Sequence, residues 1–298
     1  MGNKLAVITG AASGIGLALA KVCTQEGMDV VMVDIAELDL TKQVAQLQIS
    51  SQSTVVGMVC DVAQQEQVLQ LAKRIFSEFD RVDLLINNAG ISGNFAPLWE
   101  IPTEQIQHVL DVNLYGVIHG IKAFLPYLFE QTHTSHIVNI GSLYGLCCGS
   151  QLAAYAMSKH AVLALSESLY FDLRRLKKPV SVSVVCPSFT NTNLLVDAAP
   201  SHNLMLHQLL GHITMHGRAA GDTAEAIMQG IKNKAFYILP DQEVRHYCEQ
   251  RTIAILEQTE PYEHSVEKIL QSLNGTLDRL DFGQKDMKRA SCLSVQET

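Results

Sequence analysis

The chain has 298 residues, of which 47% are hydrophobic and 17% are charged, and its formal net charge is −8. This composition is typical of a folded protein with a sizeable apolar core and argues against disorder. A net negative charge without an evident basic face argues against nucleic acid as a partner.

The first two thirds of the chain alternate short β-branched runs with longer helical patterns. Strands are predicted at residues 5–9, 29–34, 54–59, 82–86, 136–140 and 180–186, and helices at residues 14–26, 37–49, 64–79, 104–130 and 151–177. Several strands are apolar throughout, as expected when helices cover both faces of a parallel sheet. Pro126 is expected to kink or shorten the fourth helix, because proline has no backbone N–H.

The pattern changes after Cys186. Residues 187–217 have no strand pattern, and a helix at 222–233, a last strand at 235–239 and a helix at 241–258 follow. We predict one α/β domain over residues 1–273, with about seven strands in a doubly wound parallel sheet and helices on both faces. Residues 274–298 are expected to form a mobile tail.

The cysteines and the N-terminus indicate a cytoplasmic protein. The seven cysteines are odd in number, form no Cys-x-x-Cys pair and lie mostly in apolar runs, which predicts reduced, buried thiols. A buried-strand pattern that begins at Leu5 argues against a signal peptide. The apolar stretches are interrupted too often for a membrane span, so no membrane association is expected.

A glycine-rich turn joins the first predicted strand to the first predicted helix. Its sequence, Thr-Gly-Ala-Ala-Ser-Gly-Ile-Gly, occupies residues 9–16. Glycines allow a tight turn and let the backbone approach a pyrophosphate at the positive end of a helix. Because the turn lies at a strand-to-helix junction, it predicts a dinucleotide site.

Asp34 ends the second strand, 18 residues beyond Gly16. A carboxylate at this place accepts hydrogen bonds from the adenosine ribose hydroxyls and repels a 2′-phosphate. Neither Ser13 nor Ile35 supplies the positive charge that a 2′-phosphate needs. The sequence therefore favours NAD over NADP.

Tyr155 and Lys159 are four residues apart on the fifth predicted helix, so they share a face. A phenol titrates near ~10, too high for proton transfer at neutral pH. A cation about 5 Å away favours the phenolate by roughly 3 kcal/mol at an effective dielectric constant of ~20. The pair therefore predicts a general acid/base, although such pairs are common on helices.

Three further polar features follow strands or interrupt helices. Ser142 comes just after the fifth strand, at the sheet edge where ligands bind. The Asn-Asn-Ala-Gly segment at residues 87–90 follows the fourth strand and is placed to support the adenosine side of a cofactor. Asn113 lies inside a long predicted helix although asparagine is a poor helix former, so its presence there requires an explanation.

Together these motifs resemble the short-chain dehydrogenase/reductase family, in its shorter subtype with a TG-x3-G-x-G turn. The resemblance rests on TGAASGIG, Asp61, NNAG, Asn113, Ser142 and YAMSK in the family's order and spacing, and it covers about residues 4–240. It implies a Rossmann fold and a hydride transfer between nicotinamide and a carbonyl or secondary alcohol. It also implies a homodimer or homotetramer and no metal.

The resemblance implies a role for each matching residue. Tyr155 would exchange the proton of the substrate oxygen, Lys159 would lower its pKa and bind the nicotinamide ribose, Ser142 would polarise the carbonyl, and Asn113 would hold a relay water. The cofactor-binding residues that it implies are Gly10, Ser13, Gly14, Ile15, Gly16, Asp34, Asp61, Val62, Asn88, Ala89, Gly90, Tyr155, Lys159, Pro187, Thr190 and Thr192.

The sequence departs from the family at Ser188, where a glycine usually follows Pro187, which puts the size and pose of the substrate in doubt. Residues 187–217 correspond to the family's substrate lid, and an apolar substrate is one interpretation of its leucines. Packing of the lid onto the body or another subunit explains them equally well. The candidate wall residues are Phe95, Leu143, Tyr144, Ser188, Phe189, Leu194 and Leu195.

Other interpretations remain for comparison. His212 and His216 in the lid are spaced as metal ligands, but Gly211 and Gly217 argue against a firm helix there, and no metal is expected. An NADP-preferring reductase, a dinucleotide sensor without turnover, and an epimerase or dehydratase are the alternative functions. The sensor is disfavoured because Ser142, Tyr155 and Lys159 are all present.

Overall fold

The computed structural model describes residues 3–195, 204–264 and 266–268, apart from the side chains of 195, 204–207 and 209. A seven-stranded, all-parallel sheet forms its centre, in the order β3-β2-β1-β4-β5-β6-β9. The strands are β1 (Leu5–Thr9), β2 (Asp29–Asp34), β3 (Val55–Val59), β4 (Leu84–Asn87), β5 (Ser135–Ile140), β6 (Val180–Val185) and β9 (Tyr237–Ile238). This confirms the doubly wound α/β fold.

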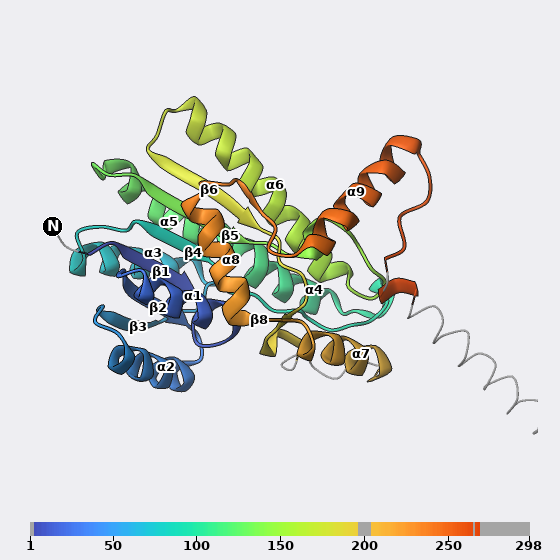
Figure 1. Cartoon of the computed structure of the whole chain (residues 1–298), viewed down its shortest axis with the longest axis horizontal. Helices are drawn as coiled ribbons and strands as arrows, with labels where there is room; N and C mark the ends of the chain where they lie inside the picture. Colours follow the sequence, from blue (N-terminus) through green and yellow to red (C-terminus); the bar gives the residue numbers. More distant parts are fainter. Residues whose placement is uncertain (1–2, 196–203, 265, 269–298) are drawn as a thin grey trace, which may run out of the picture.

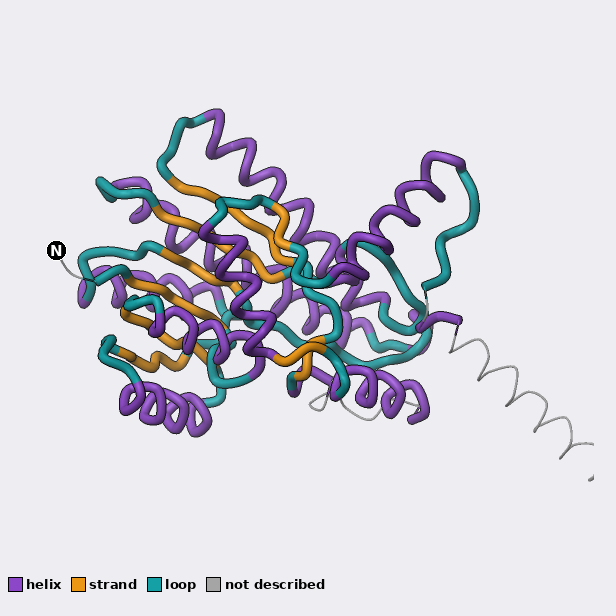
Figure 2. Tube along the Cα trace, viewed as in Figure 1, coloured by secondary structure: helices purple, strands orange, loops and turns teal. Residues whose placement is uncertain are grey.

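Helices cover both faces of the sheet (Figures 1 and 2). One face packs against α1 (Gly14–Gln25), α2 (Glu37–Ser50) and α8 (Ala220–Lys232), and the other against α3 (Gln65–Glu78), α5 (Gly116–Glu130) and α6 (Ala153–Arg175). Successive strand residues contribute to opposite cores, as Val7 and Ile8 do in β1. The apolar strand pattern therefore has the cause expected from the sequence.

The predicted boundaries agree with the structure within two residues for these strands and for most helices, and β1 and β2 match fully. The fourth predicted helix is an exception. It divides into α4 (Thr103–Leu110), a π-helical turn (Asp111–Tyr115) and α5. The break surrounds Asn113, which gives a structural reason for a poor helix former at this place.

Pro126 does not shorten α5, which continues to Glu130. The expected shortening was wrong because the apolar face of α5, including Ile121, Phe124 and Leu128, is buried against the sheet on both sides of the proline. Burial of this face stabilises the helix more than one missing backbone hydrogen bond weakens it.

The segment after β6 is more regular than its sequence indicated. Two short strands, β7 (Thr190–Asn191) and β8 (Arg218–Ala219), pair in parallel, and α7 (Leu204–Met215) runs between them, after a 3-10 turn (Asn193–Leu195). The expectation of no firm helix around Gly211 was wrong. Leu210 is buried in the core beside the cleft, and this tertiary packing outweighs the low helix propensity of glycine.

Helix α9 (Gln242–Glu257) projects from the body, and the chain then returns toward it (Figure 1). The predicted tail at 274–298 lies outside the described residues. No described helix is long and apolar enough to cross a bilayer. All six cysteines in the described ranges are free thiols; Cys23, Cys60, Cys147 and Cys186 are buried, whereas Cys148 is exposed, contrary to expectation.

Candidate functional site

A cleft of about 820 Å³ opens at the carboxyl ends of the strands, where β1 and β4 are neighbours and the chain winds in opposite directions. This is the topological switch point at which doubly wound sheets bind ligands. The predicted residues line the cleft with three exceptions: Gly16 and Asn113 lie behind its surface, and the side chain of Leu195 lies outside the described part of the chain.

The glycine-rich turn adopts conformations that require glycine. Gly10 and Gly14 have φ values of 64° and 53°, in the left-handed region. At Gly16, a Cβ atom would lie 2.1 Å from the carbonyl oxygen of Gly10 and 2.6 Å from Nδ2 of Asn88. The turn is thus closed tightly at the start of α1, whose first residues, Gly14 and Ile15, line the cleft.

The segment after β4 holds this turn in place. The Asn88 side chain donates to the carbonyl oxygens of Thr9 at 2.9 Å and Gly10 at 3.1 Å. The Thr9 hydroxyl accepts from the backbone N–H groups of Asn88 and Ala89, at 3.0 and 3.1 Å. Asn88 therefore shapes the turn as well as lining the cleft.

Asp34 lies at the end of β2, with its carboxylate beside the turn. One oxygen accepts from the N–H of Ala12 at 2.9 Å and the other from the N–H of Ala36 at 3.0 Å. These bonds fix the carboxylate at the edge of the cleft. Asp39 and Gln43 of α2 line the same end, and the sequence analysis did not single them out.

Asp61 and Val62 line the cleft after β3. The Asp61 carboxylate accepts from the N–H of Ala63 at 2.9 Å, which forms a local turn. The Val62 carbonyl oxygen lies 2.9 Å from Nδ1 of the buried His119 on α5. His119 thus links the cleft wall at Val62 to helix α5.

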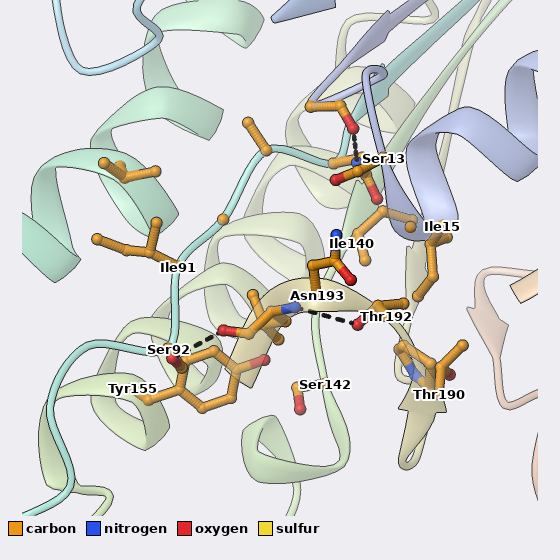
Figure 3. A pocket seen from close by; sticks show the side chains of 18 of the residues that line it. Ser13, Ile15, Ile91, Ser92, Ile140, Ser142, Tyr155, Thr190, Thr192 and Asn193 are labelled. Atoms are coloured by element: carbon orange, nitrogen blue, oxygen red, sulfur yellow. Dashed lines mark hydrogen bonds between the residues drawn. The ribbon is translucent and has the colours of Figure 1, made fainter. Parts of the chain in front are cut away.

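Ser142, Tyr155 and Lys159 meet at the opposite end of the cleft. The Tyr155 phenol points toward the Ser142 side chain, and both line the cleft (Figure 3). The Lys159 ammonium lies 5.7 Å from the centre of the Tyr155 ring and donates to the Ile140 carbonyl oxygen at 2.9 Å. The structure therefore brings together the three side chains that the sequence placed on two separate elements.

Burial dominates the electrostatics of these groups. It raises the pKa of Tyr155, while the hydrogen bond from Ser142 acts in the opposite direction. Burial also lowers the pKa of Lys159 to about 8. The net direction for Tyr155 is opposite to the sequence-based expectation, because removing a phenolate from water costs more free energy than its neighbours here return.

Asn113 is fully buried in the π-helical turn behind the cleft. Its Oδ1 accepts from the N–H of Ile91 at 2.8 Å, and its Nδ2 donates to the carbonyl oxygen of Ile91 and the hydroxyl of Ser158. The side chain thus joins the loop after β4 to α6, beside Lys159. Gly90 fits this place because a Cβ would lie 3.2 Å from Oδ1 of Asn113.

The loop after β6 forms the wall beside Ser142. Pro187, Thr190 and Thr192 line the cleft, and Thr190 is buried with its hydroxyl 3.4 Å from that of Thr223. Ser188 lines the cleft as well, but its hydroxyl donates to Glu243 of α9 and its N–H to Asp241 at 2.9 Å. The family departure at Ser188 thus connects this loop to α9.

Apolar side chains surround the end of the cleft near Tyr155. Phe95, Leu143, Tyr144, Phe189 and Leu194 line it, as predicted. Leu210, one of the lid leucines that the sequence offered as cover for an apolar substrate, lines it too. The structure adds lining residues that the sequence analysis missed: Ile91, Ser92, His108, Val112, Leu152, Asn193 and Thr214. Ile91 and Ser92 directly follow Asn-Asn-Ala-Gly, so adjacency was an available signal, whereas Thr214 reaches the cleft only through the fold of α7.

His212 and His216 are the two lid histidines whose side chains the structure describes. The rings of His212 and His216 lie 4.2 Å apart, and Nδ1 of His216 is 2.9 Å from the His212 carbonyl oxygen. Within the described ranges, no group of three or more His, Cys, Asp or Glu side chains could hold a metal ion. His202 and the side chain of His207 lie outside those ranges.

Comparisons with known proteins agree with this geometry. The family described as short chain dehydrogenase matches residues 4–202. The 1-deoxy-11-beta-hydroxypentalenate dehydrogenase of Streptomyces avermitilis is 35% identical over 241 residues, covering 80% of this chain and 85% of that protein. The CLA biosynthesis dehydrogenase/reductase of Lactiplantibacillus plantarum is 27% identical over 283 residues, covering 90% and 98%.

Among solved structures, a short chain dehydrogenase/reductase from Burkholderia phymatum in complex with NAD is similar over nearly its whole length. It is 34% identical, with a TM-score of 0.84, and the match covers 88% of this chain and 97% of that one.

Proposed function

Because this chain belongs to the short-chain dehydrogenase/reductase family, an oxidoreductase family that binds NAD(P), we propose that it transfers a hydride between NAD(H) and a carbonyl or secondary alcohol. The observation that carries this proposal is the convergence of Ser142, Tyr155 and Lys159 in one cleft. In this assignment Tyr155 is the general acid/base. We further propose that residues 1–273 act as one catalytic domain and assemble as a homodimer or homotetramer.

The cleft fits a dinucleotide along its length. The tight turn at Gly10, Gly14 and Gly16 leaves backbone room for a pyrophosphate at the start of α1. Asp61, Val62 and residues 88–90 would hold the adenosine half, and Thr190 and Thr192 would lie along the nicotinamide half. When bound, the nicotinamide supplies or accepts the hydride.

The charges at the adenosine end favour NAD. Asp34, Asp39 and Asp61 line this end, and Lys159 is the one lysine or arginine among the described residues that line the cleft. A ribose 2′-phosphate would therefore meet carboxylates, and no described side chain at this end supplies a compensating positive charge. The NAD in the Burkholderia phymatum structure supports the same choice.

The residues of this chain divide the proton chemistry. Ser142 would donate a hydrogen bond to the carbonyl oxygen, and Tyr155 would give that oxygen its proton during reduction or remove it during oxidation. Lys159, anchored on the Ile140 carbonyl oxygen, would bind the nicotinamide ribose and favour the phenolate. Asn113 fixes the loop at Ile91 and would support a water relay to Lys159.

The substrate would be largely apolar apart from its reacting oxygen. Phe95, Leu143, Tyr144, Phe189 and Leu194 form the wall beside Tyr155. The Streptomyces avermitilis relative is named as the dehydrogenase of a hydroxylated compound, which supports an alcohol or ketone substrate for this chain.

The test is a cofactor-oxidation screen. Purified protein with NADH, and separately with NADPH, is assayed against ketones, and with NAD or NADP against secondary alcohols, while NADH fluorescence reports binding. We expect NADH binding and turnover of apolar carbonyls. Binding of NADH without turnover of any substrate class would instead support a dinucleotide sensor, and a clear preference for NADPH would support the alternative cofactor.

A further inference from the structure

The wall of the cleft at Tyr144 is backed by a segment far along the chain. This segment, here called the C-terminal strap, comprises Tyr262–His264 and Val266–Lys268. It follows α9 and returns to the body (Figure 1). His264 and Val266 in it are buried, and Val266 belongs to the same apolar cluster as Tyr144 and Tyr155.

Direct contacts hold the strap on the loop that carries Tyr144. The His264 ring packs edge-on against the Tyr144 ring, with centroids 5.9 Å apart. The Glu267 carboxylate accepts from the N–H of Ser150 at 2.9 Å. A Cβ atom at Gly149 would lie 3.2 Å from Nε2 of His264, so this position leaves the imidazole little room to move.

The other face of Tyr144 belongs to the site. Its ring lines the cleft and lies 6.3 Å from the Tyr155 ring and 6.3 Å from the Phe189 ring, nearly perpendicular to the latter. Tyr144 is therefore a partition, with the substrate end of the cleft on one side and His264 on the other. A displacement of the strap would therefore let Tyr144 move and would change the space available at the substrate end of the cleft.

Packing, rather than a hydrogen bond, holds the partition. The Tyr144 hydroxyl and Nε2 of His264 are both buried and have no hydrogen-bond partner within the described residues. Burial lowers the pKa of His264, which favours the neutral, apolar form of the ring. An aromatic ring of similar size should therefore serve as well as imidazole.

The helix α9, which precedes the strap, is tied to the cleft at its start. Before α9, Asp241 accepts from the N–H of Ser188 at 2.9 Å, and Arg218 lies 3.4 Å from its second oxygen. After α9, the Tyr262 hydroxyl lies 3.4 Å from Nε2 of His246. The segment formed by α9 and the strap therefore contacts the cleft wall twice, at Ser188 before α9 and at Tyr144 after it.

We propose that the C-terminal strap sets the substrate size limit of this enzyme, with His264 as a positioning residue that acts through Tyr144. The inference rests on the proposed function, because it concerns the substrate wall of that site. We expect the wild-type enzyme to prefer carbonyl substrates with a compact apolar substituent. An enzyme whose strap is displaced should also accept substrates with a bulkier substituent.

The experiment uses the full chain and a series of ketones of increasing substituent size. In His264→Ala, we expect kcat/KM for the bulky ketones to rise about tenfold relative to the smallest ketone, mainly through a lower KM. His264→Phe should restore the wild-type ratio. The same displacement should speed amide hydrogen exchange at Ser150, which loses its partner Glu267.

Matched variants keep the test independent of folding failure. Glu267→Ala removes the acceptor of Ser150 without emptying a buried site, and should shift the size ratio in the same direction. Glu257→Ala, at the exposed end of α9, should leave the ratio and the exchange unchanged. An unchanged size ratio in both His264→Ala and Glu267→Ala, or an equal loss of kcat for every ketone, would overturn the inference while leaving the proposed function intact.

If the wild-type chain turns over no ketone, the proposed function fails and the size limit fails with it. Rapid exchange at Ser150 in the wild-type chain would overturn the inference alone, because it would mean that the strap does not stay on the loop.

Discussion

The Lys159 ammonium lies 5.7 Å from the centre of the Tyr155 ring, one helical turn away on α6, and both side chains are buried. Burial opposes charge on each of them, since it raises the pKa of the phenol and lowers that of the ammonium. The pKa values of both groups therefore differ from those in water, as is common in acid/base sites.

Removing the phenol hydroxyl tests the role of Tyr155. In Tyr155→Phe we expect NADH to bind with nearly wild-type affinity while turnover falls at least ~100-fold, the lower range for a general acid/base. Fluorescence titration and steady-state rates measure the two effects. Tyr170→Phe, on the same helix, is the control and should retain turnover. Wild-type rates in Tyr155→Phe would refute the assignment.

Neutralising Asp34 tests the cofactor preference. Asp34→Asn keeps a side-chain oxygen for one of the N–H groups of Ala12 and Ala36 but removes the charge. We expect the ratio of kcat/KM for NAD to that for NADP to fall by about tenfold, equivalent to ~1.4 kcal/mol. Asp172→Asn, on the exposed side of α6, changes the net charge equally and should leave the ratio alone. A ratio that is the same in both variants would contradict the role of Asp34.

How far the sequence predicts this site depends on the distance between the residues involved. The ends of β1 and β2, and with them Gly10 and Asp34, follow from local patterns of glycine and β-branched residues. The grouping of Ser142, Tyr155 and Lys159 follows from motif spacing together with the rule that ligands bind at the carboxyl ends of strands. These features are local or depend on the sheet topology alone.

The remaining features come from tertiary packing that no local pattern encodes. The helix α7 forms through Gly211 because Leu210 is buried beside the cleft. The π-helical turn at Asn113 depends on hydrogen bonds to Ile91, 22 residues earlier. His264 contacts Tyr144 across 120 positions of sequence, in a segment without a recognisable motif.

The buried lysine should make stability depend on pH. Its pKa is about 8 in the folded chain against an ordinary value of 10.5. Below pH 8 both states carry the proton, and the cost of burying the charge is fully present. Between pH 8 and 10.5 the unfolded chain binds more protons, so the free energy of unfolding rises with pH, by up to about 3 kcal/mol in total.

Urea denaturation of wild type and Lys159→Met across this range measures the effect. The free energy of unfolding of Lys159→Met minus that of wild type should be most positive near pH 7 and should decrease as the pH approaches 10.5. A difference that stays constant or grows with pH would mean that the ammonium is better solvated than its burial indicates. Turnover of the variant should be lost at every pH, because the ammonium would no longer hold the ribose or favour the phenolate.

Adding one methyl group at Gly16 tests the turn that would hold the pyrophosphate. A Cβ at this position would lie 2.1 Å from the Gly10 carbonyl oxygen, so Gly16→Ala must push the turn apart. We expect a destabilisation of about 1–3 kcal/mol by urea denaturation, together with at least tenfold weaker NADH binding. Gly221→Ala is the matched control: a Cβ there meets nothing within 4 Å, and α8 should gain slightly in stability because alanine favours helix. NADH affinity that is equal in the two variants would show that the cofactor does not depend on the close approach of Gly16 to Gly10.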